Sequence, residues 1–155
     1  MLEILQSVDA WLFYAVNHGW SNPVLDIVMP VVTNNLVWLP VFVIGIGWLL
    51  VAGKVKGRLC AFAMLICVLV SDPFNSKVLK EQIGRPRPYN TLRDVRVLVE
   101  RSAGKSMPSS HATNIMGAAM ILTLTYPGRW YWWYGVASLI SLSRVYVGVH
   151  YPFDL

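Results

Sequence analysis

Long apolar runs without a charged residue alternate with short polar segments along this sequence. The first run is nearly as long as the roughly 20 apolar residues that cross a bilayer as a helix. Four such runs in 155 residues are hard to bury without lipid, so the pattern predicts an all-α, polytopic transmembrane helical bundle. The runs cover residues 36–53, 59–71, 112–128 and 130–143.

The first 17 residues have a different pattern, in which apolar residues recur at helical spacing with polar residues between them. This pattern predicts an amphipathic helix, and its aromatic residues Trp11, Phe13 and Tyr14 suit a membrane interface. A turn at 18–23 leads into a second helix that should stop or kink between Pro30 and Asn35.

The polar segments predict loops at 53–58, 76–106 and 126–129. If the first and third of these loops lie on one side of the membrane, the second lies on the other. We expect residues 1–155 to form a single domain. A helix that begins at Tyr151 or Pro152 would be cut off at once, so we also expect a further span to follow.

Composition supports a membrane environment, because only 14% of the residues are charged. The net charge of +5 is concentrated in residues 76–106, where eight basic and three acidic residues leave the rest of the chain neutral. The segment holds no stacking aromatic except Tyr89, which argues against nucleic acid as a partner. An anionic head group or a phosphate substrate fits this charge better.

Three cations and two serines are candidates for binding a phosphate. Arginine can fork onto two phosphate oxygens, and Arg144 ends an uncharged run, where an unpaired charge is costly. The serines stand where a helix should begin, and a helix N-terminus attracts anions. The candidate phosphate ligands are Lys80, Arg87, Ser109, Ser110 and Arg144.

Two histidines and one carboxylate complete the candidate chemistry. His150 precedes Asp154 by four residues, so on one helix face the carboxylate could orient the imidazole for attack. His111 follows the two serines and could protonate a leaving oxygen. No cluster of ligands indicates a metal site, and we expect no cofactor.

The order and spacing of these residues resemble the three-part signature of the type 2 phosphatidic acid phosphatase (PAP2) superfamily, and the small bacterial members in particular. The matching segments are Lys80 to Pro88, Pro108 to His111 and Ser143 to Asp154. The resemblance implies a metal-independent membrane phosphatase with a phosphohistidine intermediate. In it His150 is the nucleophile, Asp154 its orienting carboxylate and His111 the general acid. The family usually has glycine where this chain has Ser110.

The resemblance implies a lipid phosphate as substrate and leaves several open: undecaprenyl pyrophosphate, phosphatidylglycerophosphate, phosphatidic acid and the lipid A 1-phosphate. It also implies the bacterial inner membrane, and we favour an active site that faces the periplasm or the cell exterior. Two alternatives remain, a lipid phosphotransferase with the same site and a non-enzymatic transporter or scaffold that binds anionic head groups.

Overall fold

The computed structural model describes residues 2–155, and every regular element within them is helical, which confirms the all-α prediction. The elements follow one another as α1 (Leu2–Asn17), α2 (Pro23–Val32), α3 (Asn35–Val51), α4 (Lys54–Phe74), a π-helical turn (Asn75–Leu79), α5 (Lys80–Ile83), α6 (Pro88–Thr91), α7 (Ser110–Thr125), a 3₁₀ turn (Pro127–Arg129), α8 (Trp130–Tyr146) and a last 3₁₀ turn (Pro152–Asp154).

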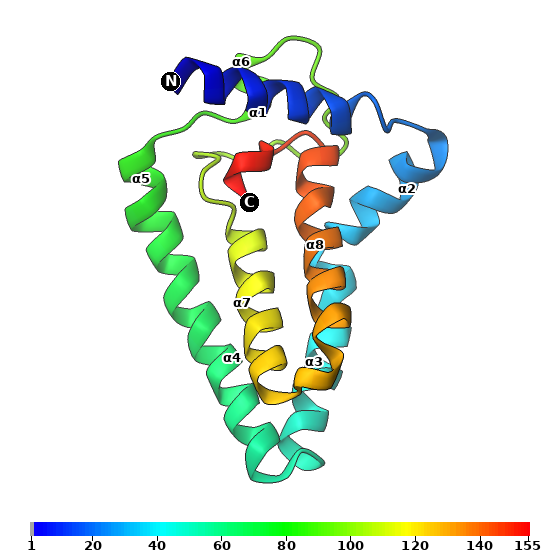
Figure 1. Cartoon of the computed structure of the whole chain (residues 1–155), viewed down its shortest axis with the longest axis vertical. Helices are drawn as coiled ribbons and strands as arrows, with labels where there is room; N and C mark the ends of the chain where they lie inside the picture. Colours follow the sequence, from blue (N-terminus) through cyan, green and yellow to red (C-terminus); the bar gives the residue numbers. More distant parts are fainter. Residues whose placement is uncertain (1) are drawn as a thin grey trace.

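Four long helices form a bundle, and α1 crosses one end of it (Figure 1). In the bundle α3 packs on α4, α4 on α7, and α7 on α8. Helices α1 and α2 both contact α8, and α1 also contacts the last 3₁₀ turn. The segment between α5 and α7 lies at the same end as α1, whereas the turns α3–α4 and α7–α8 lie at the opposite end (Figure 1).

The break predicted between Pro30 and Asn35 is confirmed. Helix α2 ends at Val32, Asn34 caps α3 by accepting a hydrogen bond from the backbone N–H of Leu36, and the two helices are bent by 50°. Both caps in this region are asparagines, because Asn22 accepts from two backbone N–H groups at the start of α2.

Two predicted loop boundaries are wrong. The loop expected at 53–58 is only a tight turn, because α4 already begins at Lys54 and carries the basic residues in its first turns. Lysine and arginine are good helix formers, so their charge did not indicate a loop. The loop expected from residue 76 begins only after Ile83, where Gly84 takes a positive φ of 64°. No proline or glycine interrupts residues 74–83 before that point.

Fewer helices than predicted are long and apolar enough to cross a membrane by themselves. Within the described residues one helical stretch, Lys54–Thr91, is long and apolar enough to cross a membrane, and α2 with α3 would qualify together as one bent span. Helices α7 and α8, with 16 and 17 residues, are shorter than the roughly 20 residues of a typical span. The four-span bundle therefore stays a prediction.

Two of the three buried apolar clusters of the described residues lie beneath α1, and the third joins α3 to α4. One buried cluster combines Met29 with Tyr146, Val147 and Val149, and a second combines Phe13 with Val145 and Tyr151. Side chains of the segment 92–99 pack against both clusters. Residues from opposite ends of the chain thus pack together around the C-terminal end of α8.

Gly148 allows the sharp turn that follows α8. Its φ is +85°, a region that favours glycine, and a Cβ at this position would lie 2.4 Å from the carbonyl oxygen of Arg96. The turn brings the backbone of segment 92–99 against the chain just before His150. Only glycine satisfies both requirements, so the position of His150 depends on it.

Gly148→Ala should therefore destabilise the fold by at least about 2 kcal/mol, from backbone strain together with steric overlap. Two matched variants separate the causes. Gly104→Ala has a positive φ but open space around it, and should cost about 1 kcal/mol, whereas Gly128→Ala has neither problem and should cost nothing. Thermal unfolding of the three purified proteins measures this order, and equal stabilities would contradict it.

Candidate active site

The structure brings the residues singled out from the sequence to the end of the bundle covered by α1. Helix α7 begins there and α8 ends there, and α5 with its following loop reaches the same end (Figure 1). Four of the candidates are almost completely buried there: Arg87, Ser109, His150 and Asp154. Lys80 and Arg144 belong to the same cluster, because the charges of Arg87, Arg144 and Asp154 all act on Lys80.

His150 and Asp154 lie together, although not on one helix face as the sequence suggested. His150 precedes the 3₁₀ turn Pro152–Asp154, and this turn folds the carboxylate back towards the imidazole. The distance between Nδ1 of His150 and Oδ2 of Asp154 is 3.4 Å, which permits a charge interaction but is too long for a good hydrogen bond. The same carboxylate oxygen accepts a shorter bond, 2.8 Å, from the backbone N–H of Tyr151.

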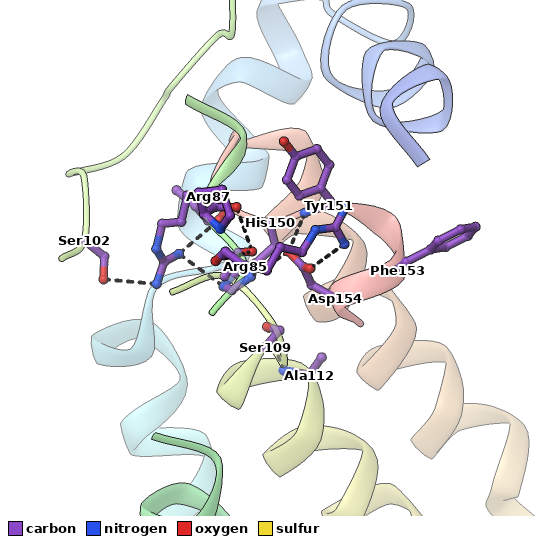
Figure 2. Close-up of polar contacts among 12 residues, drawn as sticks. Arg85, Arg87, Ser102, Ser109, Ala112, His150, Tyr151, Phe153 and Asp154 are labelled. Carbon is purple, nitrogen blue, oxygen red and sulfur yellow. Dashed lines mark hydrogen bonds and ion pairs between the residues drawn. The ribbon is translucent and has the colours of Figure 1, made fainter. Parts of the chain in front are cut away.

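The other ring nitrogen of His150 faces Arg87. Its Nε2 lies 3.3 Å from Nη1 of Arg87, and the same Nη1 donates to the carbonyl oxygen of Val149 at 2.9 Å (Figure 2). A guanidinium can only donate, so Nε2 must accept and carries the lone pair. In a neutral imidazole the proton is then on Nδ1, on the side of Asp154. This tautomer leaves Nε2 as the nucleophilic atom.

Burial also keeps this imidazole neutral. It lowers the pKa of His150 to about 4, because an imidazolium would lose its hydration there; contact with Asp154 acts in the opposite direction, and the cations Arg87 and Arg144 lower the pKa further. At neutral pH the ring is therefore unprotonated on Nε2.

Arg87 is held by the protein on all sides. Besides Val149, its guanidinium donates to the carbonyl oxygen of Gly104 and to Oγ of Ser102, both at 3.3 Å (Figure 2). These bonds fix the cation beside His150 and tie it to the loop 102–104.

Arg85 is a member of this site that the sequence reasoning missed. Its guanidinium donates to Oδ1 of Asp154 at 2.9 Å and to Oδ2 of Asp9 at 2.5 Å, and it lies 4.0 Å over the ring of Tyr151. Asp9 comes from α1 and is fully buried, and its other oxygen accepts from the backbone N–H of Phe153. Arg85 thus connects α1 to the carboxylate beside His150.

A sequence signal for this contact existed in α1. Asp9 stands four residues before Phe13 and eight before Asn17, on one helix face, and all three are buried. The outward face carries exposed apolar residues instead: Ile4, Val8 and Trp11. The polar residue Asp9 therefore marks the side of α1 that packs on the protein.

Ser109 acts in this structure as the cap of α7, because its Oγ accepts from the backbone N–H of Ala112. Its own N–H donates to the carbonyl oxygen of Asp154 at 2.8 Å, which joins the start of α7 to the last 3₁₀ turn. The hydroxyl hydrogen is thus the donor with which Ser109 could still bind a phosphate, as predicted from the sequence.

Three buried polar atoms of the site lack a hydrogen-bond partner among the described residues: Nδ1 of His150, whose contact to Asp154 is 3.4 Å long, Oγ of Ser110 and Nε of Arg144. The guanidinium of Arg144 is held at its other end, where Nη1 donates to Oγ1 of Thr33 at 2.6 Å. Buried donors are normally satisfied. The hydroxyl of Ser110 and Nε of Arg144 can both donate to an oxyanion, so these two donors fit a phosphate.

His111 lines an apolar cavity of about 850 Å³ between α3, α4 and α7. The polar part of its wall includes Asp72, Ser110 and Asn114, and the remainder is mainly aliphatic and aromatic. A second cavity of about 800 Å³ shares wall residues such as Phe42, Ile46 and Ala118 with the first, and its wall extends to Arg129 at the opposite end of the bundle.

Comparison with known proteins shows which family the sequence resembles. The PAP2 superfamily matches residues 56–155. The chain is 31% identical to a lipid A 4'-phosphatase of Bacteroides thetaiotaomicron over its full length, which covers 72% of that protein. It is 32% identical to an undecaprenyl-diphosphatase of Sulfolobus acidocaldarius over 79% of its length, which covers 56% of that protein.

Two solved structures resemble this one. The transmembrane PAP2 type phosphatidylglycerolphosphate phosphatase from Bacillus subtilis superposes with a TM-score of 0.68 at 30% identity, over 97% of this chain and 77% of that chain. LpxE of Aquifex aeolicus superposes with a TM-score of 0.75 at 22% identity, over 95% and 85% of the two chains, and shows the likeness of fold.

The pairing of Arg85 with two buried carboxylates predicts a large effect on stability. Removing one partner of a buried ion pair costs about 3–5 kcal/mol, and the 20% exposure of the Arg85 side chain reduces this to about 2 kcal/mol for Arg85→Met. Arg93→Met removes the same charge from an exposed side chain and should change stability by less than about 0.5 kcal/mol. Thermal unfolding of both variants tests this, and equal losses would show that Arg85 does not stabilise the carboxylates.

Proposed function

This chain belongs to the PAP2 superfamily, and on that premise we propose that it is an integral membrane lipid phosphatase with a phosphohistidine intermediate at His150. It is a PAP2-type phosphatase, a hydrolase of phosphoric monoesters or diphosphates. One observation supports the mechanism above all others: the buried imidazole of His150 lies between Arg87 at Nε2 and Asp154 at Nδ1. This arrangement presents a neutral nitrogen nucleophile next to a fixed cation.

In the first step Nε2 of His150 attacks phosphorus, an N–P bond forms and the bond to the leaving oxygen breaks. His111 donates a proton to that oxygen. Asp154 then stabilises the charge that develops on the imidazole through Nδ1. In the second step water attacks the phosphohistidine, His111 takes a proton from the water, and the N–P bond breaks to release phosphate.

The cations stabilise the charge on the transferred phosphoryl group. Lys80, Arg87 and Arg144 surround it, Ser109 adds its hydroxyl, and Ser110 adds its hydroxyl and backbone N–H at the start of α7. Fixed positive charges can supply the stabilisation that a divalent metal provides in other phosphatases. We therefore propose that hydrolysis needs no metal and no cofactor.

The outer surface of the bundle supports a membrane location. Large apolar side chains are exposed along α3 and α4, among them Ile44, Val51, Phe62 and Leu69. Water-soluble proteins rarely expose so continuous an apolar surface. We propose a polytopic protein of the bacterial inner membrane, with α1 at the interface and the active site facing the periplasm or the cell exterior.

The lipid substrate is proposed from the relatives, whose names include a lipid A 4'-phosphatase, an undecaprenyl-diphosphatase and a phosphatidylglycerolphosphate phosphatase. Phosphate release from lipid phosphates of these kinds and from phosphatidic acid, in detergent with EDTA, tests the function. We expect release by the wild-type protein and a loss of at least about 10⁴-fold in His150→Ala, since no other side chain takes the place of the nucleophile. Arg93→Met should retain full activity.

The same assay separates the alternatives. Phosphate that appears on an added lipid or sugar alcohol and not in solution would identify a phosphotransferase. Binding of lipid phosphates without turnover would favour a non-enzymatic scaffold. Activity that EDTA abolishes and magnesium restores would contradict the metal-independent mechanism.

The lowered pKa of His150 predicts its titration. The chain holds three histidines, and NMR of protein with ¹³C-labelled histidine can follow each ring as the pH falls. The signal that disappears in His150→Ala should titrate at about pH 4, because burial opposes protonation down to that pH. A midpoint near the usual 6.5 would mean that the ring is open to water and is protonated at mildly acidic pH.

A further inference from the structure

Asp72 is a carboxylate in an otherwise apolar part of α4. Residues 59–71 before it carry no charge, and an ionisable side chain in such a segment of a membrane helix is costly and usually functional. No side chain among the described residues forms an ion pair with Asp72. Its negative charge is therefore not neutralised by direct contact.

A chain of polar contacts links Asp72 to α7, and the contact to Asp72 itself is long. Nδ2 of Asn114 donates to Oδ1 of Asp72 at 3.4 Å, and Oδ1 of Asn114 accepts from Oγ of Ser71 at 2.7 Å. The second bond fixes the amide so that its NH₂ group points to the carboxylate. The two residues of α4 and the amide of α7 thus form one polar group across the helix interface.

This polar group lies beside His111. Asn114 follows His111 by three residues on α7, and residues at this spacing are neighbours on one helix face. His111, Asn114 and Asp72 line the same cavity, and the charge of Asp72 acts on both His111 and Lys80. The carboxylate is therefore part of the cavity wall next to the proposed general acid.

In the proposed reaction the leaving group lies next to this part of the cavity wall. Because His111 protonates the leaving oxygen, the atoms attached to that oxygen lie next to His111, and the apolar cavity below it takes the hydrophobic part of the lipid. From a phosphomonoester of an acylglycerol the leaving group is a neutral alcohol. From a polyprenyl diphosphate it is a monophosphate, which is an anion.

We propose that Asp72 selects for phosphomonoesters whose leaving group is uncharged and carries a hydroxyl, such as an acylglycerol, and against lipid diphosphates. A carboxylate accepts hydrogen bonds from hydroxyl and amine groups, and it repels an anionic leaving group at the same place. This inference rests on the proposed phosphatase function and narrows its substrate.

Asp72→Asn tests the inference, because it keeps the size of the side chain and removes its charge. The values of kcat/KM are measured in detergent micelles for lysophosphatidic acid, which releases an uncharged monoacylglycerol, and for farnesyl diphosphate, which releases an anionic monophosphate. The wild-type protein should prefer the monoester, and Asp72→Asn should shift the ratio of the two values towards the diphosphate by at least about tenfold. Asp94→Asn removes a carboxylate from an exposed position in the loop 92–109, and should leave the ratio unchanged.

A second variant adds a charge to the same wall. Asn114→Asp should shift the ratio in the opposite direction, towards the monoester. If Asp72→Asn does not fold, this variant alone tests whether a negative charge on the cavity wall sets the preference between the two substrates. An unchanged ratio in a folded, active variant would overturn the role of Asp72 and leave the phosphatase function intact. If the wild-type protein hydrolyses neither probe, nor any other lipid phosphate, the proposed function fails and the selectivity fails with it.

Discussion

A buried carboxylate must find partners that replace its hydration, and this constraint organises the end of the molecule where the motifs meet. Asp154 satisfies it with Arg85, with the backbone N–H of Tyr151 and with a contact to His150. Its backbone carbonyl accepts from Ser109, so the start of α7 is held at the same point. Arg85 also pairs with Asp9 of α1, which is likewise buried. One carboxylate thereby connects segments from both ends and the middle of the chain (Figure 2).

The end of the bundle beneath α1 and the outer surface of α3 and α4 have different properties. Beneath α1, polar groups are fixed by neighbours from distant segments, and the aromatic and aliphatic clusters around Tyr146 and Phe13 exclude water from them. A fixed, dry set of charges needs little reorganisation when a phosphoryl group is transferred, which is the main requirement of this chemistry. Along α3 and α4 the side chains are apolar and exposed, which suits a lipid environment. The cavity lined by His111 joins the two regions.

Local patterns in the sequence predicted local features well. Hydropathy placed α3, α7 and α8 within a few residues, and the alternation of runs and turns placed Lys80, His111 and Arg144 at one end of the bundle. Charge was a poor guide to loops, since Lys54 lies in a helix. The role of Arg85 could not be predicted, because its partners lie 76 and 69 residues away and meet it only through the packing of α1 and the last turn. The capping role of Ser109 likewise depends on the exact start of α7.

The central claim is that the imidazole between Arg87 and Asp154 takes the phosphoryl group onto Nε2. The most direct measurement is to mix the protein with a ³²P-labelled lipid phosphate, quench under alkaline conditions that preserve phosphohistidine, and locate the label by peptide mass spectrometry. The mechanism predicts a transient label on His150 that disappears as phosphate is released. Label on any other side chain, or turnover without a protein-bound label, would contradict it.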